Sequence, residues 1–405
     1  MRSGALSHVR VLDLSRVLAG PWASQALADL GAEVIKVERP GTGDETRGWG
    51  PPWLRDAHGH ETRASAYFAS ANRAKKSIAV DLARPEGQAI VRRLAQRADV
   101  LLENYKVGAL ARHGLGYEQL AAENPRIVYC SITGFGQSGP YRGRAGYDLL
   151  IQGMGGLMSI TGEADGEPVK VGVAVTDVLT GMYAATAVLA ALVHRDRSGR
   201  GQHIDLALLD VQIAMLANQA QSYLVTGRAP GRLGNAHPSI VPYQAFATSD
   251  GHIVLAIGND GQFARFCEVA GRPELARDPR FATNASRVQH RGELVAALAP
   301  ILAARGAADW VGALEAAGVP CGPINDLAQV FEDPHVRHRG VRVEVPDPRC
   351  GTVPVVASPI RLSETPVRYD TPPPALGQHT REVLVGILGM DEAQVDALLE
   401  RGVIA

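Results

Sequence analysis

The 405-residue chain carries 41 basic and 42 acidic side chains, and its formal net charge of −1 argues against bulk electrostatic binding to nucleic acid or to an anionic membrane. Its 4 cysteines lie far apart, which excludes a disulfide framework and indicates buried thiols in a reducing compartment. The N-terminal residues form no apolar signal core, so we expect a cytoplasmic protein.

The N-terminal third of the chain alternates strand and helix signals. Apolar runs predict strands at residues 9–14, 33–38, 77–82, 99–103 and 127–132, with helices at 22–30 and 85–97. Such alternation predicts an α/β fold with a mostly parallel sheet and helices on both faces. Ligands of such sheets bind beyond the carboxyl ends of the strands, so the loops that follow the strands matter most.

The remainder of the chain predicts two further regions. A helix at 178–193, a strand at 203–208 and a helix at 210–226 lead into a segment rich in Gly and Pro, where we place a boundary. A hairpin signal at 243–257 and three helical stretches then predict a smaller α+β domain. The expected domains are residues 1–226, 227–330 and a C-terminal tail, 331–405. The long segment 39–63 reads as a functional or mobile loop.

Asp177 is the only charged residue between Val171 and Val193, at the expected start of an apolar helix. The run is long enough to span a bilayer, but this carboxylate and the flanking sequence argue against a membrane helix. A helix N-terminus favours negative charge and should keep the carboxylate ionised, which suits a nucleophile. Position alone favours a simple helix cap.

Gly134 to Gly139 match the G-x-G-x-x-G pattern after a strand, but Pro140 follows and no helix opens there. We therefore expect no nicotinamide or flavin binding. The histidines and cysteines show no metal-ligand spacing, so no metal is expected. Basic and amide side chains gather near the strand ends and suit either a polyphosphate ligand or a solvated rim: Arg39, Asn72, Lys75, Asn104, Lys106 and Arg112.

Eight sequence blocks carry a resemblance. They include R-V-L-A-G-P (16–21), L-G-A-E-V-I-K-V-E-R-P-G (30–41), K-K-S-I-A-V (75–80), E-N-Y (103–105), R-A-G-Y-D (144–148) and S-I-V-P-Y-Q-A-F (239–246). In this order the chain resembles the class III CoA-transferases, a family that also contains α-methylacyl-CoA racemases. The likeness is strongest to the members that act on glutarate and similar dicarboxylates. It implies a Rossmann-like large domain closed by the C-terminal tail, a small domain and an interlocked homodimer.

The resemblance also implies site residues. Asp177 matches the catalytic aspartate, and Tyr147 and Asp148 match the pair beside the thioester. Residues that match or accompany the CoA contacts are Val17, Leu18, Arg39, Asn72, Lys75, Asn104, Tyr105 and Arg112. His237 and Ser239 lie where formyl-CoA transferases carry a glycine run, and we expect them to help bind an acceptor carboxylate.

The expected reaction moves CoA from a donor such as succinyl-CoA to a C4–C6 dicarboxylate through an aspartyl-CoA thioester. Acyl-CoA and carboxylic acids are then the partners, and coenzyme A enters as a substrate thioester. Backbone N–H groups near Asp177 and around Gly153–Gly156 are expected to stabilise oxyanions. A racemase remains the alternative, although Tyr147 stands where racemases carry His, and a binding protein without turnover is a second alternative.

Overall fold

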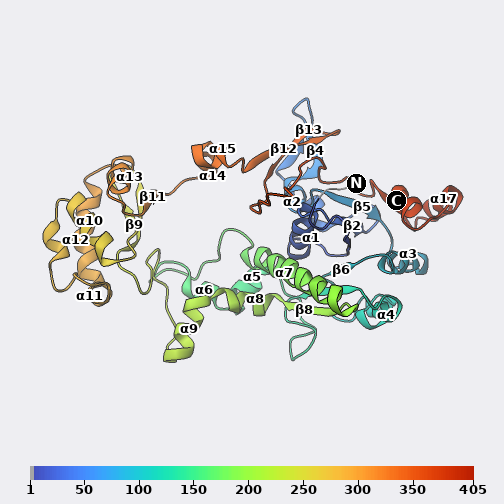
Figure 1. Ribbon diagram of the computed structural model, residues 1–405, viewed down its shortest axis with the longest axis horizontal. Coiled ribbons are helices and arrows are strands. Elements are labelled where there is room, and N and C mark those ends of the chain that lie inside the picture. The colour runs from blue at the N-terminus through green and yellow to red at the C-terminus, as the bar shows by residue number, and fades with distance from the viewer. Residues whose placement is uncertain (1–3) are drawn as a thin grey trace. The chain divides into compact units, whose positions relative to one another are not determined.

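Six parallel strands form the central sheet of the first of two units in the computed structural model, which describes residues 4–405 (Figure 1). The strand order is β5-β2-β1-β6-β7-β8, and every neighbouring pair is parallel. The strands are β1 (Arg10–Asp13), β2 (Glu33–Glu38), β5 (Lys75–Ala79), β6 (Val100–Glu103), β7 (Val128–Thr133) and β8 (His203–Ala207). The predicted α/β class is therefore confirmed.

Alternate residues of these strands feed two apolar cores, one on each face of the sheet. In β1, Leu12 belongs to one core and Val11 to the other, as the period of two in a strand requires. On the Leu12 side pack α3 (Pro85–Ala95), α16 (Thr380–Gly386) and α17 (Glu392–Glu400). On the Val11 side pack α1 (Ala19–Asp29) and α7 (Val175–Ser198). The inner strands β1, β6 and β7 are thus buried on both faces, whereas the edge strand β8 leaves His203 and Asp205 exposed.

Helix α7 begins three residues before the predicted start and ends at Gly199, whose φ of 74° suits a glycine stop. Its length and hydropathy also meet the criterion for a membrane span, and in this structure Ala184, Val188 and Ala191 of the same helix are buried in a core. The single helix predicted at 210–226 divides into α8 (Leu208–Met215) and α9 (Ala217–Thr226), because Ala217 adopts a φ of 43°.

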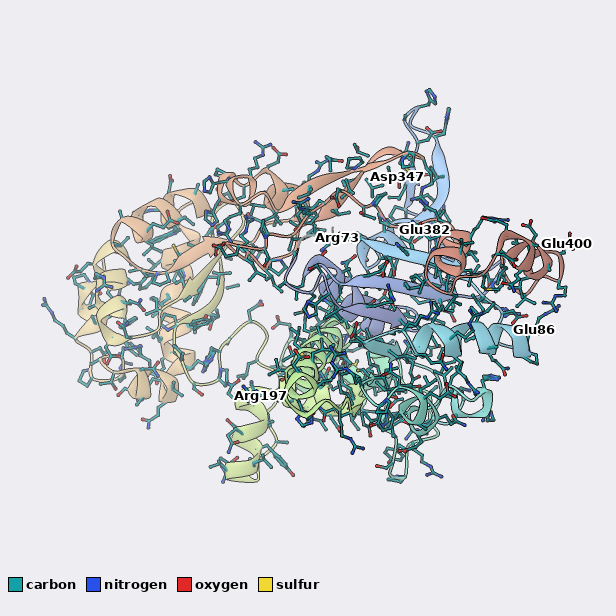
Figure 2. All side chains as sticks on the ribbon, turned by 45° about the vertical axis from the view of Figure 1, so that its right-hand side comes forward. Arg73, Glu86, Arg197, Asp347, Glu382 and Glu400 are labelled. Carbon is teal, nitrogen blue, oxygen red and sulfur yellow. The ribbon has the colours of Figure 1, made fainter. Side chains whose placement is uncertain are left out.

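The C-terminal tail returns to the edge strand β5. Lys76 forms an ion pair of 2.8 Å with Glu382 on α16, and Glu382 and Glu400 mark the two tail helices in Figure 2. The N–H of Asp81 donates to the carbonyl of Val403 at 2.8 Å. The expected loop at 39–63 is more ordered than predicted, because it contains a short 3-10 helix (Glu45–Gly48), β3 (Trp53–Arg55) and most of β4 (Glu61–Ser65).

The second unit comprises residues 158–170 and 222–336, so its boundaries lie near the expected 227 and 330, while 158–170 were not expected in it. Its antiparallel sheet has the order β11-β10-β9, formed by β9 (Tyr243–Ala247), β10 (His252–Ala256) and β11 (Cys321–Pro323). An apolar core built on Phe263, Phe266 and Leu298 joins this sheet to its helices. These are α10 (Asp260–Val269), α11 (Asn284–Gln289), α12 (Arg291–Ala303) and α13 (Ala307–Ala316).

The remaining elements are short. They are α2 (Ala66–Ser70), α4 (Tyr117–Glu123), α5 (Asp148–Met154), α6 (Leu157–Ile160), α14 (Leu327–Glu332), α15 (Pro334–His338) and the hairpin of β12 (Arg342–Asp347) and β13 (Gly351–Val356).

Candidate active site

A cavity of about 190 Å³ opens at the carboxyl ends of β1, β6 and β7 in the first unit. This is the position where open α/β sheets bind ligands. The residues that the sequence singled out and that line this cavity are Val17, Leu18, Asn104, Tyr105, Lys106, Tyr147 and Asp177. The parallel sheet brings them together, because the segments that carry them follow three strands that end at the same edge.

Asp177 is the third residue of α7, and its half-buried side chain lines the cavity. Ala174 occupies the N-cap position, so the interpretation of Asp177 as a simple cap is wrong. The predicted helix start was three residues late because Val175 and Thr176, both poor helix formers, already have helical geometry. The carboxylate is therefore free to serve chemistry rather than helix termination.

Asp148 takes the capping role from a different helix. Its Oδ1 accepts the N–H of Thr176 at 2.9 Å and the N–H of Asp177 at 3.4 Å. Its other oxygen accepts Nε2 of Gln152 at 2.6 Å. Asp148, the first residue of α5, therefore supplies the negative charge that the N-terminus of α7 favours.

Burial first, and the charge of Asp148 second, raise the pKa of Asp177 to about 7. The sequence-based expectation of a carboxylate held ionised by the helix N-terminus is therefore wrong, because Asp148 already occupies that N-terminus. Near neutral pH the side chain divides between its two protonation states. A carboxylate with a raised pKa is more basic and hence a stronger nucleophile than an exposed one, and such shifts are typical of active sites.

Three of the backbone N–H groups that were expected to stabilise oxyanions instead donate to acceptors within the protein. The N–H groups of Thr176 and Asp177 donate to Asp148, and the N–H of Gly155 donates to the carbonyl of Ile151 within α5. Gly155 instead allows close packing, because a Cβ there would lie 2.3 Å from Cγ of Gln212. This part of the prediction is wrong for these N–H groups.

Four cations line the cavity wall: Arg16, Lys106, Arg142 and Arg144. The guanidinium of Arg144 lies 4.6 Å from the ring centre of Tyr141 and 5.2 Å from that of Phe135. Sequence reasoning missed Arg142 and Arg144, although they follow the glycine-rich turn after β7 that had been considered only as a dinucleotide motif. Glu45 also lines the cavity and forms an ion pair with Arg16, so Lys106, Arg142 and Arg144 are the cations that suit the phosphates of an extended anionic ligand.

The other predicted CoA contacts lie elsewhere. Of the residues that the structure describes, those lining this cavity do not include Arg39 or Arg112, which are exposed after β2 and in a 3-10 turn (Ala111–His113). Asn72 and Lys75 are fully buried: Nζ of Lys75 donates to Oδ1 of Asn72 at 2.8 Å and lies 3.3 Å from Oδ2 of Asp13. A direct CoA contact by Asn72 or Lys75 is contradicted by this burial, since their polar atoms bond inside the fold.

Tyr147 precedes α5 as its N-cap residue and is 67% exposed at the cavity. His237 and Ser239 belong to the second unit, where Nδ1 of His237 accepts the N–H of Ser239 at 3.1 Å. Nη2 of Arg291 donates to the carbonyl of His237 at 2.7 Å. These bonds order the segment locally, and its contact with an acceptor stays a prediction.

The α/β fold and the cavity lined by Asp177 and by cationic side chains suit an extended anionic ligand, and comparison with known proteins identifies the class of protein. Residues 6–380 match the family model for CoA-transferase family III, so the chain belongs to that family and is a CoA-transferase.

A succinate–glutarate CoA-transferase of Agrobacterium fabrum is 53% identical over 383 residues, which cover 95% of this chain and 96% of that protein. A succinyl-CoA:glutarate CoA-transferase of Mus musculus is 49% identical and covers 98% of this chain and 90% of its own length. The crystal structure of a CAIB/BAIF family protein from Brucella suis superposes with a TM-score of 0.84 at 48% identity, covering 95% of this chain and 100% of that one.

Proposed function

We propose that the protein transfers CoA from succinyl-CoA to a short dicarboxylate, with glutarate as the first candidate, through a thioester on Asp177. The observation that carries the mechanism is the cavity-lining Asp177 carboxylate beside Asp148, with its pKa raised to about 7. The choice of donor and acceptor rests on the names of the similar transferases.

The reaction proceeds through two anhydrides. Asp177 attacks the thioester carbonyl of the donor, the C–S bond breaks, and CoA leaves as a thiolate. Asp177 and the donor acyl group now form the first anhydride. The thiolate attacks the aspartyl carbonyl, releases the donor as a free carboxylate and leaves an Asp177–CoA thioester. The acceptor carboxylate then attacks the carbonyl of this thioester, which releases the CoA thiolate and forms the second anhydride, between Asp177 and the acceptor. The thiolate attacks the acceptor carbonyl of this anhydride and forms the new acyl-CoA. Asp177 emerges as a carboxylate and the thioester bond is conserved.

A racemase is the competing proposal, since related enzymes share this fold. It requires two groups that exchange protons with the substrate α-carbon near neutral pH. A tyrosine hydroxyl is a poor base near neutral pH, and Tyr147 is mostly exposed to water. The position of Tyr147 therefore favours transfer over racemisation.

We also propose a homodimer in the cytoplasm. Apolar side chains on α9 are left in water, with Leu224 73% and Val225 74% exposed, and clustered exposed apolar residues mark interaction surfaces. Interlocking of the two chains follows from family resemblance alone. Light scattering on wild type and Leu224→Glu tests the dimer, and an unchanged monomeric mass for both would contradict it.

The test of the reaction separates mechanism from specificity. Protein mixed with succinyl-CoA alone should gain the mass of CoA minus water on the peptide that contains Asp177. Glutarate is then compared with pentanoate, which has the same chain length but lacks the distal carboxylate. Leaving the partners of that carboxylate unpaired costs about 1–3 kcal/mol, so pentanoate should be roughly 5- to 100-fold poorer in kcat/KM. Equal kcat/KM values would remove the dicarboxylate proposal and leave the CoA transfer.

A further inference from the structure

The turn between β1 and α1 has a backbone conformation that its sequence does not favour. Val17 has a φ of 70°, in the left-handed region. A β-branched side chain is strained there, because its Cβ substituents crowd the backbone. Arg16, Val17 and Leu18 all line the active-site cavity, so the strain lies at the site itself.

Distant side chains hold the two peptides that precede the Cα of Val17. Nζ of Lys36 donates to the carbonyl of Ser15 at 2.8 Å. The amide of Asn104 binds both sides of Arg16, accepting its N–H at 2.9 Å and donating to its carbonyl at 2.7 Å. Oδ1 of Asp44 accepts the N–H of Val17 at 3.3 Å.

We call Lys36, Asp44 and Asn104 the holders of this turn. Two of these holders, Lys36 and Asp44, form a buried ion pair. Nζ of Lys36 lies 2.9 Å from Oδ2 of Asp44, and both side chains are 0% exposed. Oδ1 of Asp44 also accepts the N–H of Thr46 at 3.0 Å and its hydroxyl at 2.8 Å. Lys36 lowers the pKa of Asp44 to about 2, against the opposing effect of burial, so the pair stays charged throughout the neutral range. Replacing a buried pair by apolar groups often leaves a fold equally stable, so the presence of this pair invites a functional explanation.

We infer that Lys36, Asp44 and Asn104 are positioning residues that hold the Arg16–Leu18 turn in its left-handed conformation, the one that accepts the acyl-CoA substrate. In the relaxed conformation Val17 would return to negative φ, and the cavity wall would be rebuilt. A binding-competent state that is only a fraction of the population weakens the apparent affinity by that fraction. The resemblance predicted a direct contact between Asn104 and CoA. In this proposal Asn104 instead affects CoA binding through its hydrogen bonds to the backbone of Arg16. The inference rests on the proposed function in that CoA occupies this cavity.

Glycine at position 17 provides the decisive variant. Without a Cβ, glycine enters the left-handed region as readily as the right-handed one, so the holders become dispensable. We expect Lys36→Met/Asp44→Asn to weaken the binding of free CoA about 10-fold, and the added Val17→Gly to restore it to within about 3-fold of wild type. Titration calorimetry measures the affinity without turnover, and the Tm of each variant is recorded beside it.

Arg73 and Asp29 provide the matched control pair. Nη2 of Arg73, labelled in Figure 2, lies 2.5 Å from Oδ2 of Asp29, and both side chains are buried and absent from the cavity lining. Arg73→Met/Asp29→Asn should leave the CoA affinity within about 2-fold of wild type, whatever its Tm. An equal loss of affinity in the control would show a general packing effect and overturn the inference.

Asn104→Ala with and without Val17→Gly covers the case in which the Lys36/Asp44 variant does not fold. Rescue by glycine supports positioning, whereas a loss that glycine leaves unrescued indicates a direct CoA contact and overturns the inference for Asn104. Wild-type protein that binds no CoA would instead refute the proposed function. CoA binding by wild type together with unaltered binding by every holder variant would refute this inference alone.

Discussion

Asp148 accepts the N–H of Asp177 at 3.4 Å and at the same time raises the pKa of the Asp177 side chain. Two carboxylates thus share one helix N-terminus, and only one of them receives its N–H groups. Asp148 has the favourable position and stabilises α7, while Asp177 is left desolvated beside a like charge. This division gives the helix its cap and leaves Asp177 with a raised pKa, which suits the nucleophilic role proposed for it.

Asp148→Asn should lower the pKa of Asp177, because the amide oxygen can still accept the N–H groups of Thr176 and Asp177 but carries no charge. The acidic limb of the pH profile of kcat/KM should therefore move to lower pH. Part of the shift remains, since burial is its first cause. The new amide N–H₂ faces Nε2 of Gln152, at a cost of about 1 kcal/mol in stability. An unchanged pH profile would show that its acidic limb does not report the ionisation of Asp177.

Asp177→Asn should abolish transfer, with a loss of at least about 10³-fold in rate, equivalent to about 4 kcal/mol. It should also raise the Tm. Because the folded-state pKa exceeds the unfolded value of 3.8, the stability supplied by the protonated carboxyl is complete below pH 4 and is lost as the pH rises through about 7. Asparagine resembles the neutral acid, so its advantage over wild type should be larger at pH 8 than at pH 5. A pH-independent difference in Tm would contradict the raised pKa.

Alanine at Arg142 or Arg144 should weaken CoA-ester binding about 10- to 100-fold, the effect of one charge-assisted hydrogen bond of about 1.5–3 kcal/mol. The same range is predicted for Arg39 and Arg112, which the resemblance assigns to CoA phosphates. Arg197, exposed near the end of α7, is the control and should be neutral. The KM of the acceptor should change little, and parallel losses for donor and acceptor would point to misfolding.

Tyr147→Phe should reduce transfer by about 10-fold for one lost hydrogen bond, and should leave the substrate α-hydrogen unexchanged in deuterated water. Tyr141→Phe, in the same loop and packed against Phe135, is the matched control. Deuterium incorporation that disappears with the Tyr147 hydroxyl would revive the racemase alternative.

The parallel sheet followed from the sequence because its strand signals alternate with helix signals and its inner strands are buried on both faces; β2 begins and ends where predicted. The position of Asp177 relative to its helix did not follow. The cap comes from Asp148, 29 residues earlier, and no local sequence pattern predicts a capping residue that belongs to another helix. Burial likewise decided the outcome for Asn72 and Lys75. A Lys in a basic run looks like surface, and only the folded chain reveals Asp13 beside it.

Arg16 and Val17 illustrate the same limit at the cavity wall. The resemblance placed Val17 and Leu18 of R-V-L-A-G-P among the CoA contacts, but the left-handed conformation of Val17 depends on groups contributed by β2, by the segment after it and by the segment after β6. Single-residue preferences predict the opposite conformation. Long-range side-chain to backbone bonds override them, and these cannot be read from neighbours in the sequence.

Residues 403–405 lie against residues 79–81, where the N–H of Ala405 donates to the carbonyl of Ala79 at 3.2 Å. The edge strand β5 can therefore form these contacts only after a segment more than 300 residues later in the chain has been synthesised. Until then β5 offers unpaired backbone groups to any other extended chain, a known route to aggregation.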